Sequence, residues 1–181
     1  IANSHYTGLR GNQMAAGSTY TPIATTTLGS AQATVTLSSI SGSYTDLVLV
    51  ISTRFTGGGG ASAIQAQFNS DSGSNYSSTV LSGNGSSASS FRDTSATSAS
   101  FGLAIDTANE FATSIIQLQN YSNATTYKTT LCRANIASDR VRAIVSLWRN
   151  TSAINSIYLQ NNGATTFVAG STFTLYGIAA A

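Results

Sequence analysis

Residues 68–77, FNSDSGSNYS, place Asn, Asp and Gly among serines with a spacing similar to that of a calcium-binding loop. An EF-hand loop needs oxygen ligands at alternate positions, a Gly at the sixth position and a bidentate Glu at the twelfth. Counted from Asn69, the fifth position is Gly73, the twelfth is Val80, and Asp71 supplies the loop's single carboxylate. One carboxylate carries too little charge to hold calcium tightly, so we predict a turn between two strands.

Nucleophilic and metal-assisted catalysis lack the residues that they need. His5 is the only imidazole, and Cys132, the only cysteine, lies in the apolar run TTLCRA, where we predict a small buried hydrophobic residue. A Ser-His-Asp or Cys-His site needs an imidazole beside its nucleophile, and transition metals need clustered His, Cys or carboxylate ligands. A glycosidase pair is harder to exclude because its two carboxylates can be distant in sequence, but Asp46, Asp71 and Asp106 fall at strand edges or turns. We predict that the chain is not an enzyme and binds no metal or cofactor.

Basic residues are too few and too scattered for a nucleic-acid-binding surface. Eight Lys and Arg against six Asp and Glu leave a net charge of +2, whereas nucleic-acid-binding proteins gather cations on one face. The cluster that exists consists of Arg133, Arg140, Arg142 and Arg149. Arg140 and Arg142 would share one face of a strand, where a phosphate or acidic partner is the alternative to solvated strand ends. We expect no nucleic-acid partner.

The composition predicts a folded chain with a neutral, hydroxyl-rich surface. Charged residues make up 8% of the 181 residues, against roughly 25% in an average soluble domain, while 41% are hydrophobic. A surface with so little charge gives little repulsion between molecules, which suits a subunit held in an assembly. No segment approaches the roughly 20 apolar residues of a membrane span, so we expect no membrane partner.

From Pro22 onward the sequence predicts short strands separated by turns rich in Gly and Asn. Val35 and Leu37 alternate with polar residues, as a half-buried strand requires, and residues 45–55 are apolar on both faces, which predicts a covered central strand. Further strands are predicted at 63–69, 77–83, 100–106, 111–121, 127–134, 140–150, 154–160 and 171–178. In 140–150 one apolar face consists of Val141, Ala143, Val145 and Leu147. We predict an all-β, antiparallel two-sheet β-sandwich of jelly-roll type.

Aromatic side chains are the remaining candidates for recognition. Trp148 either packs against a sheet face or offers a stacking surface to a sugar. Tyr76, Tyr121, Tyr127 and Tyr158 lie near turns, where Tyr often serves recognition. Structural packing explains most of these side chains better, and we retain four as candidate contacts to a glycan or partner: Trp148, Tyr76, Tyr121 and Tyr158.

The N-terminal residues differ from the rest of the chain. They are rich in Gly, Asn and Ala and alternate poorly, so we interpret 1–21 as an extended arm that precedes a sandwich of residues 22–181. Its candidate assembly contacts are His5, Tyr6, Leu9, Arg10 and Met14. Arms of this kind commonly reach a neighbouring subunit, and a frayed terminus is the alternative.

The chain resembles a family of small proteins encoded by tailed bacteriophages, many of them from aquatic hosts. The resemblance covers residues 22–178 and rests on TYTPIATTTLGSAQATVTLSSI, SYTDLVLVIS, FNSDSGSNYSSTVLSGNGSSAS, NYSNATTYKTTLCRAN, SLWRNTSAINSIYL and FVAGSTFTLYGI, in this order. The pieces LWRNTSAINSI and GSTFTLYGI are the most specific. The resemblance implies a β-sandwich on the exterior of the virion, bound to other virion proteins and oligomeric, most often trimeric. It supplies no catalytic or ligand-binding residues.

Three functions compete at this point. The first is a capsid decoration or minor capsid protein whose arm docks on the head. The second is a receptor-binding tail or fibre tip that contacts host surface glycans through its turn-borne Tyr and Asn residues and Trp148. The third is a free carbohydrate-binding module, which would bind glycans without any particle.

Overall fold

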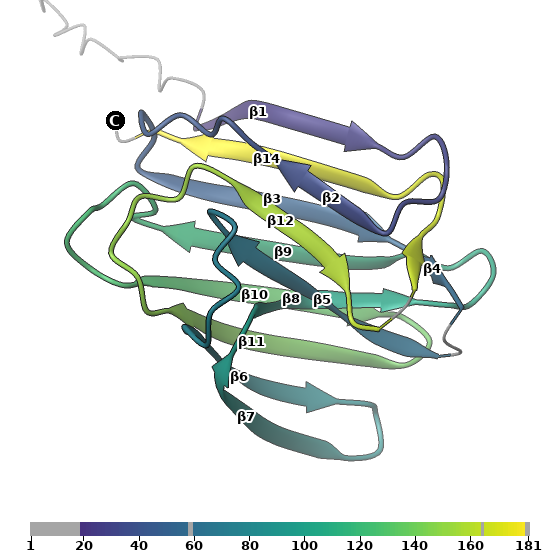
Figure 1. The fold of residues 1–181 in the computed structure, drawn as a ribbon. Coiled ribbons are helices and arrows are strands. Elements are labelled where there is room, and N and C mark those ends of the chain that lie inside the picture. Colours follow the sequence, from purple (N-terminus) through teal and green to yellow (C-terminus); the bar gives the residue numbers. More distant parts are fainter. Residues whose placement is uncertain (1–18, 58–59, 164, 180–181) are drawn as a thin grey trace, which may run out of the picture.

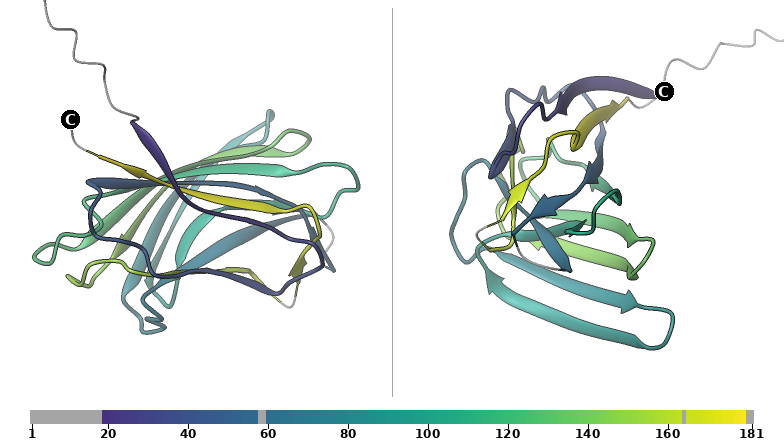
Figure 2. Two further views of the ribbon diagram at one scale, coloured as in Figure 1. Left: turned by 90° about the horizontal axis from the view of Figure 1, so that it is seen from above. Right: turned by 90° about the vertical axis from the view of Figure 1, so that its right-hand side faces the viewer.

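The computed structural model describes residues 19–57, 60–163 and 165–179, which form fourteen strands and no helix (Figure 1). The larger sheet has the order β1 (Tyr20–Thr27), β14 (Thr172–Ile178), β3 (Asp46–Thr53), β9 (Ala112–Gln119), β10 (Lys128–Ile136), β11 (Arg140–Trp148), β6 (Tyr76–Gly83) and β7 (Ala88–Ala96). The smaller sheet has the order β2 (Thr34–Leu37), β12 (Ile157–Asn161), β5 (Ala61–Phe68) and β8 (Ala99–Ile105). A separate ladder pairs β13 (Thr166–Phe167) with β4 (Phe55–Thr56). Every strand pair is antiparallel, and Figure 2 shows the two main sheets as separate layers.

Eight of the strands have the connectivity of a jelly roll. Numbered one to eight along the chain, these are β1, β2, β3, β5, β8, β9, β12 and β14. Their order is then 1-8-3-6 in the larger sheet and 2-7-4-5 in the smaller sheet, the pattern of two interlocked Greek keys. The predicted fold class is therefore confirmed, and we call these eight strands the jelly-roll part.

Two inserted hairpins widen the larger sheet beyond the jelly roll. The β6–β7 hairpin is inserted between β5 and β8, and the β10–β11 hairpin between β9 and β12. In space they follow β9 in the order β10-β11-β6-β7. We call these four strands the extension. In Figure 1 its outer hairpin, β6–β7, lies at the lower edge of the molecule.

An aromatic cluster joins the extension to the jelly-roll part. The ring centroid of Phe68, on β5, lies 5.4 Å from that of Trp148 on β11 and 5.6 Å from that of Phe101 on β8. The ring of Tyr76, on β6, stacks on Trp148 with centroids 6.3 Å apart. All four side chains are buried. Because aromatic residues bury large areas, this cluster forms an extensive apolar contact between the two parts.

The ten predicted strands are present, and their positions follow the sequence pattern closely. The predicted central strand is β3, which lies between β14 and β9. Its inward side chains are fully buried, and Val48 on the opposite face is also buried. A strand that the pattern did not reveal is β7, because eight of its nine residues are exposed and no apolar period marks it.

The predicted boundary between arm and sandwich needs a correction. Tyr20 and Thr21, assigned to the arm, already belong to β1, where Tyr20 pairs with Ile178 of β14. Pairing with β14, the last strand of the sandwich, makes these two residues part of the larger sheet. The arm candidates His5, Tyr6, Leu9, Arg10 and Met14 lie outside the described residues.

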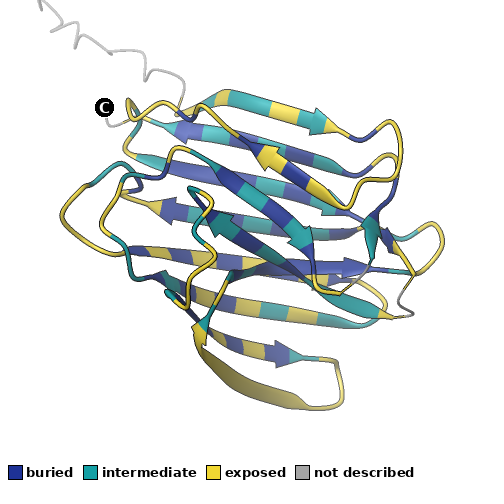
Figure 3. Cartoon of the chain, in the orientation of Figure 1, coloured by how far each residue is buried: buried dark blue, intermediate teal, exposed yellow. Residues whose placement is uncertain are grey.

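The apolar face of β11 points away from the core. An alternating strand in a half-solvated sheet normally buries its apolar side. Here Ile144, Ser146 and Trp148 face inward and are buried, while Val141 and Val145 are 60% and 50% exposed. Trp148, on the inward face, anchors the strand in the core, and Val141 and Val145 are left on the surface. Figure 3 shows exposed and buried positions alternating along the strands of this part of the sheet.

Candidate functional site

The turn in FNSDSGSNYS is built around the carboxylate of Asp71. This carboxylate accepts hydrogen bonds from the backbone N–H of Gly73 at 2.9 Å, the side-chain amide of Asn75 at 2.9 Å and the indole Nε1–H of Trp148 at 2.7 Å. Burial raises the pKa of Asp71, but the hydrogen bonds outweigh it and hold this pKa below its ordinary value. Among the described residues, no group of three or more His, Cys, Asp and Glu could hold a metal ion. The carboxylate therefore serves as an acceptor inside a turn.

Three of the four predicted aromatic contact residues are buried. Trp148 is 1% exposed, and Tyr76 and Tyr121 are 0% exposed. The hydroxyl of Tyr76 donates to the Asp71 carbonyl at 2.9 Å and accepts from the N–H of Phe68 at 3.0 Å, and burial raises the pKa of this phenol to about 12. The hydroxyl of Tyr121 donates to the carbonyl of Ser41. These contacts support the packing alternative and place none of the three rings where a glycan could stack.

Tyr158 is the one of the four retained aromatic candidates that reaches the surface. It is half-buried on β12, on the outer face of the smaller sheet, and its hydroxyl lies 3.4 Å from Oε1 of Gln160. The amide of Gln160 donates in turn to Oε1 of Gln65 at 3.3 Å. This face therefore presents amides and hydroxyls to the surroundings.

The arginines flagged in the sequence do not converge on one site. Arg149 donates to the carbonyls of Ser74 and Tyr76 and so closes the Asp71 turn. Arg140 and Arg142 share the inner face of β11, as predicted, because they pair with Ile136 and Ala134, which are both buried. The exposed Arg133 lies on the outer face.

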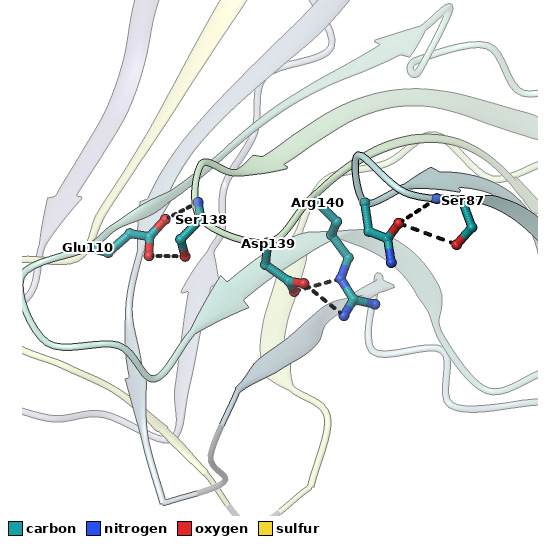
Figure 4. Close-up of polar contacts among 6 residues, drawn as sticks. Ser87, Glu110, Ser138, Asp139 and Arg140 are labelled. Atoms are coloured by element: carbon teal, nitrogen blue, oxygen red, sulfur yellow. Dashed lines mark hydrogen bonds and ion pairs between the residues drawn. The ribbon is translucent and has the colours of Figure 1, made fainter.

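Polar contacts brace the turn between β10 and β11 (Figure 4). Arg140 donates through Nε to Asp139 at 2.6 Å, while the hydroxyl of Ser138 donates to Glu110 at 2.5 Å and its N–H to the same carboxylate at 2.9 Å. The side-chain hydrogen bond from Ser138 is the main reason that the pKa of Glu110 lies below its ordinary value. Glu110 thereby ties the turn to the segment before β9.

Cys132 is a buried structural residue, as predicted. Its thiol lies 3.4 Å from the carbonyl of Phe101, and burial raises its pKa to about 12. A thiol with so high a pKa forms almost no thiolate at neutral pH, and the thiolate is the reactive form.

The most distinctive surface feature is an apolar patch on the outer face of the extension. It consists of Leu81 on β6, Leu131 on β10, and Val141, Ala143 and Val145 on β11. Leu81, Leu131, Val141 and Val145 are 46–60% exposed. The register places Ala143 opposite Leu81, and Val145 opposite Leu131, so the five side chains are contiguous.

A hollow adjoins the patch and gives it shape. Its volume is about 610 Å³, and its lining includes Leu81, Ile115, Arg133, Val141 and Ala143. Contiguous apolar surface rimmed by polar groups is typical of contacts between proteins. Arg133 supplies a charged group at this rim. From the sequence, this surface was visible only as an alternating strand at 140–150, and the alternation did not indicate which face of the strand other residues would cover.

Comparison of the chain with family models, with curated proteins and with solved structures finds no match. Within the part of the chain that the structure describes, no helix is long and apolar enough to cross a membrane. The function is therefore inferred from the chain's own surfaces.

Proposed function

We propose that the chain is a non-enzymatic virion protein that decorates the head of a tailed phage. The observation that carries this proposal is the apolar patch on the extension. Four aliphatic side chains half-exposed on one sheet face are costly in water, since each buried Å² of apolar surface is worth roughly 25 cal/mol. A subunit that meets another protein through this patch recovers that free energy.

The shape and chemistry of the remaining surface agree with this role. Jelly rolls occur in viral capsid proteins and in lectins, and fold alone does not assign a function, so this agreement is an analogy. The resemblance to phage proteins supplies the setting. In our proposal the apolar patch contacts neighbouring virion proteins, the residues that precede β1 add a second contact to the head, and the polar outer face of the smaller sheet points outward.

Particle assembly with patch variants tests the proposal. Val141→Thr with Val145→Thr keeps side-chain shape and strand propensity but makes the patch polar. We expect folded protein with reduced occupancy on heads, measured by immunogold labelling of intact particles. Thr34→Val with Thr36→Val, on the exposed side of β2, is the matched control and should leave occupancy unchanged. Full occupancy with the patch variant would contradict the proposal.

A receptor-binding tail or fibre tip is the second candidate. The half-buried Tyr158 beside Gln160 and Gln65, on the polar face, favours it, because amides and an aromatic ring suit sugar hydroxyls. Immunogold confined to the tail end would support this candidate and overturn the first. Glycan binding by a chain that no gold labelling finds on intact particles would instead favour a free carbohydrate-binding module.

A further inference from the structure

A second hollow lies on the inner side of the extension, where the smaller sheet no longer covers it. This cleft has a volume of about 360 Å³ and lies between the β6–β7 hairpin and strands β5 and β8. Phe91 and Asp93 on β7 pair with Val80 and Ser78, which are both buried. Because directly opposite residues in a ladder share a face, Phe91 and Asp93 point to the inner side, into the space that β8 leaves open.

Arg142 supplies an unneutralised cation to the cleft. Its guanidinium carbon lies 5.8 Å from the centre of the Phe91 ring, and its Nε is buried without a hydrogen-bond acceptor. No salt bridge joins Arg142 to another described residue, whereas the neighbouring Arg140 is paired with Asp139. Burial lowers the pKa of Arg142, and the charge of Arg140 lowers it further, against an opposing effect of Asp139. An arginine remains protonated in proteins, so this group is a partly buried cation that forms no salt bridge with a described residue.

The other walls of the cleft are polar and largely neutral. They include Ser62, Ser98, Ser100 and Asn162. At the floor, the hydroxyls of Ser78 and Ser146 lie 2.8 Å apart, and the N–H of Ser100 donates to Ser78 at 3.1 Å. The floor is thus rigidly hydrogen-bonded, and the amides and hydroxyls above it can bind several hydroxyl groups.

The charges in the cleft limit the kind of anion that fits. Arg142 attracts one negative charge, and Asp93 in the same cleft repels additional ones. A phosphate dianion or a nucleic acid is therefore a poor fit. A single carboxylate matches the guanidinium in charge and planar geometry, and hydroxyl groups on the same ligand can donate to Asp93.

From these features we infer that the cleft binds a hexuronic acid unit of an acidic polysaccharide. The sugar carboxylate pairs with Arg142, the exposed part of the Phe91 ring packs on the C–H surface of the sugar, and Asp93 accepts hydrogen bonds from its hydroxyls. A cleft of this volume is within the range of small-ligand sites. The inference is independent of where the chain sits in a virion, because it involves the opposite face of the extension from the apolar patch.

Calorimetric titration of the full chain tests the inference with defined probes. The galacturonic acid trimer is expected to bind, and the uncharged galactose trimer of the same linkage is expected to bind at least about tenfold more weakly, because it lacks the charge-assisted hydrogen bonds. Equal binding of the two trimers, or absence of binding by the acidic trimer, would overturn the inference. Equal affinity for inorganic phosphate would show a general anion site and would overturn it as well.

Variants assign the binding to this cleft. Arg142→Gln should weaken binding of the acidic trimer at least about tenfold, whereas Arg133→Gln removes the same charge from the other face of the sheet and should leave affinity unchanged. Equal losses in the two variants would place the binding elsewhere. If Arg142→Gln fails to fold, the same titration with Phe91→Leu and with Asp93→Asn, both on the exposed hairpin, tests whether the ligand binds in this cleft. We expect the first to weaken uronate binding and the second to reduce the preference for uronate over phosphate; unchanged binding in both would refute the site.

Discussion

The jelly-roll part and the extension are built from the same kind of strand but bury different shares of it. In β3, at the centre of the jelly-roll part, no residue is exposed, whereas in β7, at the edge of the extension, eight of nine residues are exposed. The difference arises because the smaller sheet has only four strands and cannot cover an eight-stranded sheet. The Arg142 cleft lies where this cover ends, and the apolar patch lies on the opposite, outer face of the same extension.

This difference shows how an insertion adds surface to a stable fold. When the β10–β11 hairpin pairs with the free edge of β9, the backbone N–H and C=O groups along that edge become hydrogen-bonded. The cost of leaving these polar backbone groups unpaired is thereby avoided. The side chains on the faces of the hairpin are then free to serve binding. The jelly-roll part supplies the two covered sheets, and the extension carries the surfaces that we propose to be functional.

Removing the ring that joins the two parts is expected to have the largest effect. Trp148→Ala should lower the free energy of unfolding by about 3–5 kcal/mol, because it leaves a cavity beside Phe68 and Tyr76 and removes the indole bond to Asp71. Denaturant unfolding monitored by circular dichroism measures this change. Leu131→Ala on the exposed face is the control, with an expected change below about 1 kcal/mol. Equal losses in the two variants would mean that the outer face is also covered.

A glycine pair compares the packing of the two parts directly. Gly102, on β8, has a φ of 141°, and a Cβ atom there would lie 2.1 Å from Oγ of Ser114. Gly102→Ala should therefore cost about 2–4 kcal/mol from strain and overpacking. Gly83, on β6 of the extension, has no atom within 4 Å of the same position, so Gly83→Ala should be nearly neutral. Thermal unfolding of both variants tests the contrast, and a neutral Gly102→Ala would show that β8 is loosely packed.

The Asp71 turn closes the start of the extension, and its loss should have a smaller effect. Asp71→Ala removes the acceptor of the Trp148 indole and of Gly73, and should cost about 1.5–3 kcal/mol, as expected for hydrogen bonds to a charged group. Chemical denaturation gives the value. A cost below about 0.5 kcal/mol would indicate that the turn is held by Arg149 without the carboxylate.

The same carboxylate predicts a pH dependence. Because the pKa of Asp71 in the folded protein lies below 3.8, its value in an unfolded chain, its stabilising contribution is complete above pH 3.8. This contribution is lost as the pH falls through the lower, folded pKa. The difference in unfolding free energy between the natural chain and Asp71→Asn should therefore shrink in acid, which denaturation at pH 7 and in acid measures. A constant difference would rule out this linkage.

The smallest effect on stability is expected at the apolar patch. Val141→Thr with Val145→Thr should change the free energy of unfolding of the separate chain by no more than about 0.5 kcal/mol per site, since both side chains are exposed. The same variant should lose association, measured by light scattering during size-exclusion chromatography at increasing concentration or with particle proteins. A large loss of stability would instead identify the patch as core that the chain covers itself.

The alternation of apolar and polar residues predicted ten of the fourteen strands, since period two is a local property of the chain. It predicted β3 as a covered strand and the turn around Asp71, because both depend on neighbouring residues. It did not predict β7, or the roles of Phe91 and Asp93, which stand alone in a stretch rich in Ser and Thr. Arg142 was visible only as one member of an arginine cluster.

Only the tertiary structure decided which face of each strand is buried. Val141 and Val145 form a regular apolar row, but they lie on the outer face of the larger sheet, where they stay exposed, while the smaller sheet lies on the inner side. The same non-local arrangement buried Trp148, Tyr76 and Tyr121, which looked available for recognition, and left Arg142 beside an open cleft. The sequence by itself thus determined an all-β chain and its strand positions, because these depend on local propensity and periodicity. The exposed surfaces depend on contacts between residues far apart in the chain, which local periodicity does not specify.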